Sequence, residues 1–295
     1  MRHILKCHEM VKPDFVKAAN CDLYDADGRQ YVDFESGEWC TSVGHIHPQI
    51  QASIKEQLSR VIHLGYRYTS HLAEEAAISL LETLNIPHGK CVFLSSGSEA
   101  VELAVQIARA VTERRLLLTL AESYLSAYGT AGRMSADDWI CVGLDGRLAP
   151  KTTDYQDSYS IFFDQVAAFV LEPGSASGTI RFPSVQLVDL LTKGIRRKNG
   201  IVVVDEVTTD MGRIGQWYGF NHYRIEPDIV AYGKGLGNGY PVSAVAMRHD
   251  IAEKLEKSGF HYVQSNKNDP LACAVAKEVI NVIRDEEVIQ RSSSL

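Results

Sequence analysis

Short apolar segments alternate with longer amphipathic ones over most of this chain. The apolar segments cover residues 91–94, 116–120, 140–142, 167–171, 201–204, 229–232 and 243–247. Short runs rich in β-branched residues and bounded by glycine or charge are typical of strands buried on both faces of a parallel sheet. Segments with helical spacing lie between several of them, clearest at 99–110 and 185–197. The pattern predicts an α/β fold with a mostly parallel, seven-stranded sheet and helices on both faces.

The first 65 residues have a different pattern and are predicted to form a separate N-terminal segment. Residues 20–36 alternate apolar and polar positions around Asp27-Gly28, which indicates a β-hairpin. Pro48 opens a predicted helix, and a second one runs from His71 to about Asn85. The first of these has its apolar face at Ile50, Ile54, Leu58 and Val61.

We therefore divide the chain into an N-terminal segment (1–65), a large α/β domain (66–270) and a C-terminal helical region (271–295). The last region is predicted to be helical from Pro270 to about Val288, with a frayed end at Ser292–Leu295. No segment repeats at a fixed period, so a solenoid or repeat array is excluded.

Composition and charge narrow the class of protein. The chain has 295 residues, of which 45% are hydrophobic and 23% charged, as in ordinary globular proteins. Its formal charge of -7 gives no indication of nucleic-acid or membrane-surface binding. No apolar run approaches the roughly 18 residues of a membrane span, and the polar start does not resemble a signal peptide. We expect a cytoplasmic protein.

Cysteine and histidine give no metal pattern. The six cysteines are scattered without a CxxC pair, and we expect reduced thiols that mostly pack in the core. His45 and His47 have neither a partner cysteine nor an HExxH spacing. We interpret them as part of a loop leading to Pro48, and we expect no metal.

Opposite charges follow two of the predicted strands. Residues 201–204 end on Asp205-Glu206, and residues 229–232 are followed by Lys234 between two glycines. In α/β proteins the carboxyl ends of the strands form the edge at which ligands bind. Our hypothesis is that Lys234 forms a Schiff base with an aldehyde cofactor and that Asp205 tunes the ring of that cofactor.

A turn after the first strand of the sheet has the features of an anion site. Residues 95–99, Ser-Ser-Gly-Ser-Glu, lead into a helix, and Ser96 with Glu99 fits a capping box. A small-residue turn before a helix offers free N–H groups and the positive end of the helix dipole. Many such turns are only caps, so the motif alone leaves both interpretations open. It is neither a Walker A loop nor a GxGxxG fingerprint.

These motifs in combination resemble the class III (ornithine/ω-amino acid type) aminotransferases, pyridoxal 5'-phosphate (PLP) enzymes of fold type I. The resemblance runs from about residue 22 to 276. Six segments match in order: DADGRQYVDFESG with VGHIHPQIQASIKEQL, SSGSEAVELAVQIAR, VLEPGSASG, VVVDEVTTDMGRIGQ, IVAYGKGLGNGYPVSAVAM and NDPLACAVA. An ordered set of this kind is far more specific than any single member.

The resemblance implies a role for each matched residue. Lys234 stands at the Schiff-base lysine and Asp205 at the acid that pairs with the pyridine nitrogen. Gly97 and Ser98 match the phosphate-binding pair. The remaining matches concern the cofactor ring and the second subunit: Tyr124 stacks on one ring face, Val207 packs on the other, Glu172 lies near the phenolic side, and Ser265 replaces a threonine that reaches the neighbouring subunit's phosphate.

The sequence also departs from the family pattern. Leu125-Ser126 follows Tyr124 where the family has His-Gly, and Asp210-Met211 replaces Gly-Phe. The stretch between Tyr124 and Glu172 is short. The chain ends soon after the NDPLACAVA segment, so we expect the family's C-terminal small domain to be largely missing.

The resemblance implies ping-pong transfer of an amino group from an amino acid or amine to a 2-oxo acid, in a homodimer with the site at the subunit interface. Residues 61–75 are candidate dimer contacts, as is the apolar N-terminal segment. A PLP-dependent aminomutase, racemase or decarboxylase of the same class would use the same residues. A non-catalytic scaffold that kept the fold is the alternative of a different kind.

Overall fold

The computed structural model of the protein describes residues 3–5, 7, 14–135, 137–147, 163–175 and 180–295. A seven-stranded sheet forms its centre, with strand order β4-β10-β9-β8-β7-β5-β6. Its strands are β4 (Lys90–Leu94), β5 (Leu116–Leu120), β6 (Trp139–Val142), β7 (Val166–Leu171), β8 (Ile201–Asp205), β9 (Ile229–Tyr232) and β10 (Ser243–Met247). The seven predicted strands are confirmed, each within one residue at either end.

The sheet is mostly parallel, as predicted. Strands β5 to β9 pair in parallel, whereas β10 runs antiparallel to both of its neighbours, β4 and β9. Because β4 and β9 are both antiparallel to β10, they point in the same direction as each other. The carboxyl ends of six strands therefore meet at one edge.

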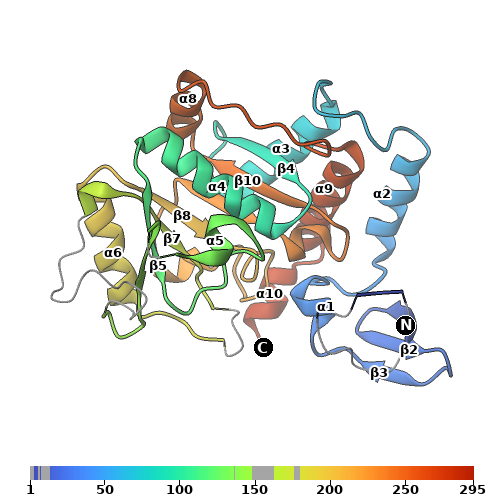
Figure 1. Ribbon diagram of the computed structural model, residues 1–295. Helices are drawn as coiled ribbons and strands as arrows, with labels where there is room; N and C mark the ends of the chain where they lie inside the picture. Colours follow the sequence, from blue (N-terminus) through green and yellow to red (C-terminus); the bar gives the residue numbers. More distant parts are fainter. Residues whose placement is uncertain (1–2, 6, 8–13, 136, 148–162, 176–179) are drawn as a thin grey trace.

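Helices cover both faces of the sheet because successive strand residues point to opposite sides. One face packs against α3 (His71–Thr83), α6 (Val185–Arg197) and α9 (Pro270–Asp285). The other packs against α4 (Gly97–Thr112), α5 (Gly129–Arg133) and α8 (His249–Lys257), with α4 lying across the sheet in Figure 1. Every residue of β6 to β10 is buried, which explains their continuous apolar sequences. Short elements complete the fold: η1 (Phe163–Gln165), α7 (Phe220–Tyr223) and η2 (Lys234–Gly237).

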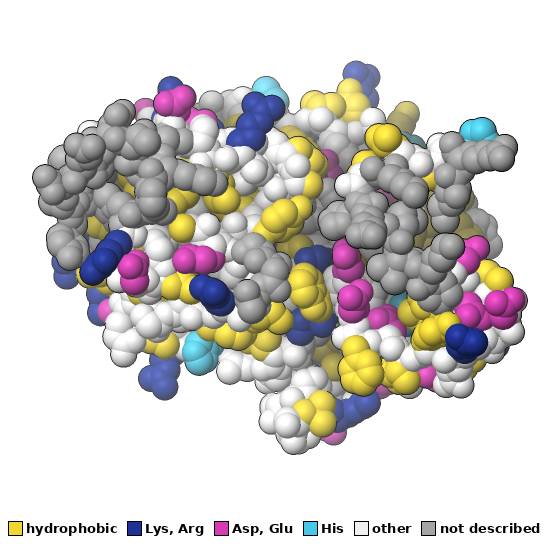
Figure 2. Space-filling view, turned by 60° about the horizontal axis from the view of Figure 1, so that its bottom comes forward, with side chains coloured by type: hydrophobic (Ala, Val, Ile, Leu, Met, Phe, Trp, Pro, Cys, Tyr) yellow, Lys and Arg dark blue, Asp and Glu magenta, His cyan; other side chains and the backbone are white. Residues whose placement is uncertain are grey.

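The N-terminal segment forms a small sheet of its own, at the lower right of Figure 1. The predicted hairpin is confirmed as β2 (Asp22–Asp25) and β3 (Gln30–Val32), and the structure adds β1 (Phe15–Ala19), which the pattern did not predict. A short turn, α1 (Ser36–Trp39), follows it. Acidic side chains gather in the right half of Figure 2, on the side where Figure 1 places this segment.

Helix α2 (Pro48–Leu58) is shorter than predicted, and its buried face is different. Leu58 and Val61 were expected to face inward, but both are exposed. Gln57 is buried instead, and its amide donates a hydrogen bond to the carbonyl of Val61 at 2.6 Å. That bond satisfies the buried amide at the end of the helix, where the chain turns away.

The end of the chain also differs from the prediction. Helix α9 stops at Asp285, and Glu287, with φ 51°, breaks the helical path. A second helix, α10 (Val288–Ser293), follows where a frayed end was expected. It is held in place because Ser293 donates a hydrogen bond to the carbonyl of Gly215 at 3.3 Å. Helix α9 packs against α2 and α3.

All six cysteines are free thiols. The expectation that they mostly pack in the core holds for Cys141 and Cys273, which are buried. It is wrong for Cys7 and Cys21, which are exposed on the N-terminal segment. Among the described residues from 1 to 40, only Asp25 is buried, so the surroundings of these two thiols offer little core to enter.

Candidate active site

A cavity of about 640 Å³ lies at the carboxyl edge of the large sheet. It is lined by Phe34, Glu35, Glu38, Trp39, Ser96, Gly97, Ser98, Tyr124, Leu125, Glu172, Asp205, Val207, Thr208 and Lys234. Seven of the eight site residues named from the sequence are in this set. They come from segments far apart in the chain because five strands deliver their last residues to the same edge.

The positive end of α4 faces this cavity. Ser96 caps the helix, since its hydroxyl accepts the N–H of Glu99 at 3.3 Å. The predicted capping box is only half formed, because the Glu99 carboxylate accepts the N–H of Ser95 rather than that of Ser96, at 3.0 Å. The first N–H groups of a helix have no acceptor within it. At Gly97 and Ser98 these groups belong to residues that line the cavity, so they are available to an anion there.

Gly97 leaves room for Val207. A Cβ added at Gly97 would lie 2.7 Å from one methyl carbon of Val207, closer than real Cβ contacts. Gly233 is restricted as well, since its Cβ would lie 3.0 Å from the Gly97 Cα. The absence of side chains at these two glycines therefore lets the α4 turn, the β8 end and the β9 end converge.

Asp205 is a buried acid at the base of the cavity, with 3% of its surface exposed. One carboxylate oxygen accepts the backbone N–H of Val207 at 3.0 Å. Burial, followed by the negative charge of Glu172, raises the pKa of Asp205 well above its usual range, although the Val207 bond and Lys234 act in the opposite direction. Such a carboxyl is best satisfied by a cationic partner inside the cavity.

Lys234 starts the 3₁₀ turn η2 directly after β9 and has a positive φ of 33°. Its Nζ lies 4.7 Å from the centroid of the Trp39 ring. Burial lowers the pKa of Lys234, while Asp205 is the largest of the influences that raise it. A lowered pKa increases the share of neutral, nucleophilic amine near pH 7.

Tyr124 and Glu172 are joined at the far side of the cavity. The Tyr124 N–H donates to one Glu172 carboxylate oxygen at 2.9 Å, so the buried Glu172 fixes the backbone that carries the ring. Tyr124 is 52% exposed, whereas Leu125, at the family's usual histidine, is buried. Ser98 is tied to the same loop because its hydroxyl accepts the Ala127 N–H at 2.9 Å.

Two further acids lie behind the site. Glu206 accepts the N–H groups of Gly219 and Phe220, each at 2.8 Å, and the hydroxyl of Thr209 at 2.6 Å. Burial raises the pKa of Glu206 to about 7 against the pull of these hydrogen bonds. Asp210 is also buried, and among the described residues its Oδ2 has no hydrogen-bond partner.

Ser265 is the one predicted site residue that does not line the cavity, and it is exposed. The sequence interpretation, in turn, missed Phe34, Glu35, Glu38 and Trp39, which the N-terminal segment contributes to the cavity lining. The sequence does contain a pattern that could have indicated them, namely two aromatic and two acidic residues in one loop next to a glycine. Because this loop lies about 200 residues before Lys234 in the chain, the sequence does not link the two.

Comparison with known proteins identifies the family. The sequence model of aminotransferase class III matches residues 6–135 and 153–295. The chain belongs to the class III aminotransferases. These PLP-dependent enzymes move an amino group from a donor to a 2-oxo acid, and that activity is assigned to this chain.

Relatives with different names support the family assignment. An acetylornithine aminotransferase of Aquifex aeolicus is 27% identical, over 96% of this chain and 77% of the relative. An acetylornithine aminotransferase of Streptococcus mutans is 31% identical, over 96% of this chain and 74% of the relative. A leucine/methionine racemase of Thermococcus litoralis is 29% identical, over 95% of this chain and 69% of the relative.

Solved structures support the fold. An S-selective transaminase from an Arthrobacter species with alanine bound has a TM-score of 0.86 at 24% identity, over 98% of this chain and 72% of that one. The taurine:2-oxoglutarate aminotransferase of Bifidobacterium kashiwanohense, in complex with PLP and glutamate, has a TM-score of 0.82 at 21% identity, over 97% and 71%. The predicted fold type I is therefore confirmed.

The described residues fit PLP. The α4 N-terminus at Gly97 and Ser98 suits a phosphate, and the buried Asp205 suits a ring cation. His45 and His47 each pair with a carboxylate, and the described residues contain no group of three or more side chains suited to a metal ion. In the described part of the chain, no helix has the length and apolar character to cross a membrane.

Proposed function

We propose that the cavity around Lys234 holds PLP and that its residues divide the work of transamination. The observation that carries this proposal is the meeting of Lys234, Asp205 and the α4 N-terminus in one cavity. When bound, PLP supplies an aldehyde that condenses with amines and a protonated ring that accepts the electron pair released at the substrate's Cα.

Lys234 provides the amine for the cofactor's aldehyde. Its lowered pKa supports this role, because only the neutral amine can act as a nucleophile or take up a proton. With cofactor and amino donor bound, the same Nζ would take a proton from the substrate's Cα and give one back. Its place at the start of η2, fixed by the end of β9, keeps that nitrogen at the cavity.

Asp205 holds a proton at the pyridine nitrogen of the cofactor. The burial that raises the pKa of Asp205 also strengthens its attraction to a cation that enters the cavity. The Val207 N–H orients the carboxylate for this contact. Glu172 contributes on the phenolic side through the Tyr124 backbone that it orients.

The phosphate is bound by Gly97 and Ser98 at the α4 N-terminus, with the N–H groups there as donors. Tyr124 and Val207 would enclose the two faces of the cofactor ring. Their positions in the cavity lining support both roles. Ser265, exposed in a loop of this chain, is assigned to the phosphate of a second subunit.

The active form is proposed to be a homodimer in the cytoplasm. The loop before α3 exposes Val61, Ile62, Tyr66 and Tyr68, which supplies an apolar surface for a second copy. Free thiols, including the exposed Cys7 and Cys21, are as expected in a reducing compartment. Of the N-terminal segment, which the sequence also offered as a contact, residues 1–2, 6 and 8–13 lie outside the described residues.

Absorbance of the purified protein with added PLP tests the cofactor site. We expect a band near the visible edge that borohydride removes, with the reduced adduct on Lys234 by mass spectrometry. Lys234→Ala should lack both, whereas Lys254→Ala, on the exposed side of α8, should keep them. A protein that stays colourless and unlabelled at Lys234 would overturn the proposal and favour a scaffold.

A screen of amino donors with 2-oxo acid acceptors tests the reaction itself. Transamination converts the acceptor to an amino acid in a one-to-one ratio with donor consumed. Racemisation, which the Thermococcus relative makes the next candidate, leaves the acceptor unchanged and inverts the donor. Chiral analysis of both products separates the two.

A further inference from the structure

Residues Ser36–Trp39 form a left-handed turn beside the active site. Four consecutive φ angles are positive: 50° at Ser36, 57° at Gly37, 55° at Glu38 and 64° at Trp39. The Trp39 N–H donates to the Glu35 carbonyl at 2.8 Å, which closes one turn of left-handed helix. Three of these four residues have a Cβ, for which this conformation is unfavourable. Such a segment persists only where its surroundings hold it.

Asp33 holds the beginning of this turn. Its two carboxylate oxygens accept the N–H groups of Glu35 and Gly37, each at 2.9 Å. The Nε2 of His45 lies 2.7 Å from the second oxygen, the one that also accepts the Gly37 N–H. The histidine therefore fixes the carboxylate, and the carboxylate fixes the backbone.

Arg213 holds the end of the turn. Its guanidinium donates to the carbonyl oxygen of Trp39 and, at 3.0 Å, to the hydroxyl of Ser42. It reaches them from the segment after β8, so the turn is attached to the same strand end that carries Asp205. Both ends of a strained segment are thus anchored by charged groups.

The turn presents Trp39 to Lys234. The Lys234 Nζ lies 4.7 Å from the centroid of the indole ring, a distance at which an ammonium is attracted to an aromatic face. Trp39 also lines the proposed PLP cavity, so it is close to the reacting nitrogen without replacing any of the matched site residues.

We propose that Asp33, His45 and Arg213 are positioning residues that hold this turn so that the Trp39 indole keeps the Lys234 amine in place at the cavity. The inference rests on the proposed function in that it takes Lys234 as the amine that reacts with PLP. The contact between Trp39 and Lys234 is nevertheless a property of the chain alone, and it can be measured without cofactor.

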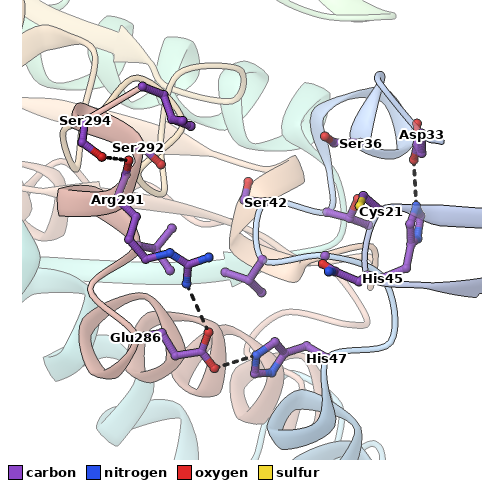
Figure 3. A pocket seen from close by; sticks show the side chains of 16 residues that line it. Cys21, Asp33, Ser36, Ser42, His45, His47, Glu286, Arg291, Ser292 and Ser294 are labelled. Carbon is purple, nitrogen blue, oxygen red and sulfur yellow. Dashed lines mark hydrogen bonds and ion pairs between the residues drawn. The ribbon is translucent and has the colours of Figure 1, made fainter.

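The chain contains a matched control for His45. His45 and His47 line the same second cavity, and each pairs with a carboxylate, as Figure 3 shows. The partner of His45 is Asp33, which holds the turn. The partner of His47 is Glu286, at the end of α9, which is unconnected to it. Substitution of His45 or of His47 removes one histidine–carboxylate pair. Only the substitution of His45 is expected to release the turn that carries Trp39.

The first measurement is tryptophan fluorescence of the cofactor-free protein. The spectrum of the wild type minus that of Trp39→Phe gives the emission of Trp39. Lys234→Met removes the nearby charge and should shift this emission. When Lys234→Met is added to His45→Ala, this shift in emission should disappear. In His45→Gln the shift should return, because the glutamine amide can still donate a hydrogen bond to Asp33. In His47→Ala the shift should be the same as in the wild type. Equal behaviour of His45→Ala and His47→Ala would overturn the inference.

The second measurement is the rate at which PLP reacts with Lys234, followed by absorbance. We expect His45→Ala to slow it at least tenfold and His47→Ala to leave it within twofold; equal rates in the two variants would overturn the inference. If wild-type Lys234 does not react at all, the proposed function fails, while the fluorescence result still decides the inference. Should His45→Ala not fold, Arg213→Lys, which loses the planar fork that binds Trp39, replaces it in both measurements.

Discussion

The side chain of Val207 occupies the space that any side chain on Gly97 would need. A Cβ on Gly97 would approach one Val207 methyl carbon to 2.7 Å and the other to 2.9 Å. Val207 is at the end of β8 and Gly97 at the start of α4, so this contact sets the distance between the proposed phosphate and ring subsites.

Substitution of Gly97 should therefore weaken PLP binding through Val207. We expect Gly97→Ala to introduce overpacking of about 1–3 kcal/mol, or roughly tenfold to hundredfold weaker binding of PLP. Adding Val207→Ala should recover most of that loss, because it removes the methyl groups that clash. Titration of PLP absorbance measures both. If the double variant binds no better than Gly97→Ala, the contact is not the cause.

Asp205→Asn tests the charge at the ring nitrogen. The amide has nearly the shape of the carboxylate but cannot hold a proton on the pyridine nitrogen, so the ring accepts electrons less well. We expect PLP to bind within about tenfold of wild type while transamination falls by about 10²–10³-fold. Single-turnover kinetics with PLP bound separate the two effects. Wild-type turnover in Asp205→Asn would remove Asp205 from the mechanism.

Asp210 should make the stability of the cofactor-free protein depend on pH. Burial, followed by the charge of Glu206, raises the pKa of Asp210 well above its usual range. Because the folded-state pKa lies above the unfolded one, its contribution to stability is present at low pH and is lost as the pH rises through the folded-state value. Asp210→Asn has no such loss. Its free energy of unfolding should exceed that of wild type by about 1 kcal/mol or more at pH 9 and by less at pH 5.

Urea denaturation at both pH values measures this difference. Asp27→Asn, at an exposed turn position of the N-terminal segment, is the control and should follow the wild type at both. A pH-independent difference between Asp210→Asn and wild type would mean that Asp210 is ionised in the folded protein over this range, as it is in the unfolded chain.

Glycine should be tolerated in the left-handed turn and not in a regular helix. At Glu38, with φ 55°, glycine removes the unfavourable Cβ but increases the entropy of the unfolded chain. We expect Glu38→Gly to leave the free energy of unfolding unchanged or raise it by up to about 1 kcal/mol. Gln106→Gly, at an exposed interior position of α4, should lower it by roughly 0.5–1 kcal/mol. Thermal and urea unfolding compare the two, and equal losses would contradict strain at Glu38.

The sequence by itself determined the sheet and the chemistry at its edge. Buried strands such as β8 and β9 leave an unbroken apolar run, and the residue after each run lies at the ligand edge in any such sheet. Asp205, Lys234 and Gly97 could therefore be named before the structure. The six ordered segments that carry the family resemblance are also local, since each is a short stretch of neighbouring residues in the chain.

Only the tertiary structure decided what lies opposite those residues. Trp39 meets Lys234 because a loop of the N-terminal segment folds back over the sheet edge, and no local pattern encodes a contact across about 200 residues. The end of α2 at Leu58 and the separate helix α10 depended likewise on partners elsewhere, such as Gly215 for Ser293. The spacing of apolar residues along a helix or strand indicates which of its faces is apolar. It does not indicate which neighbouring element covers that face.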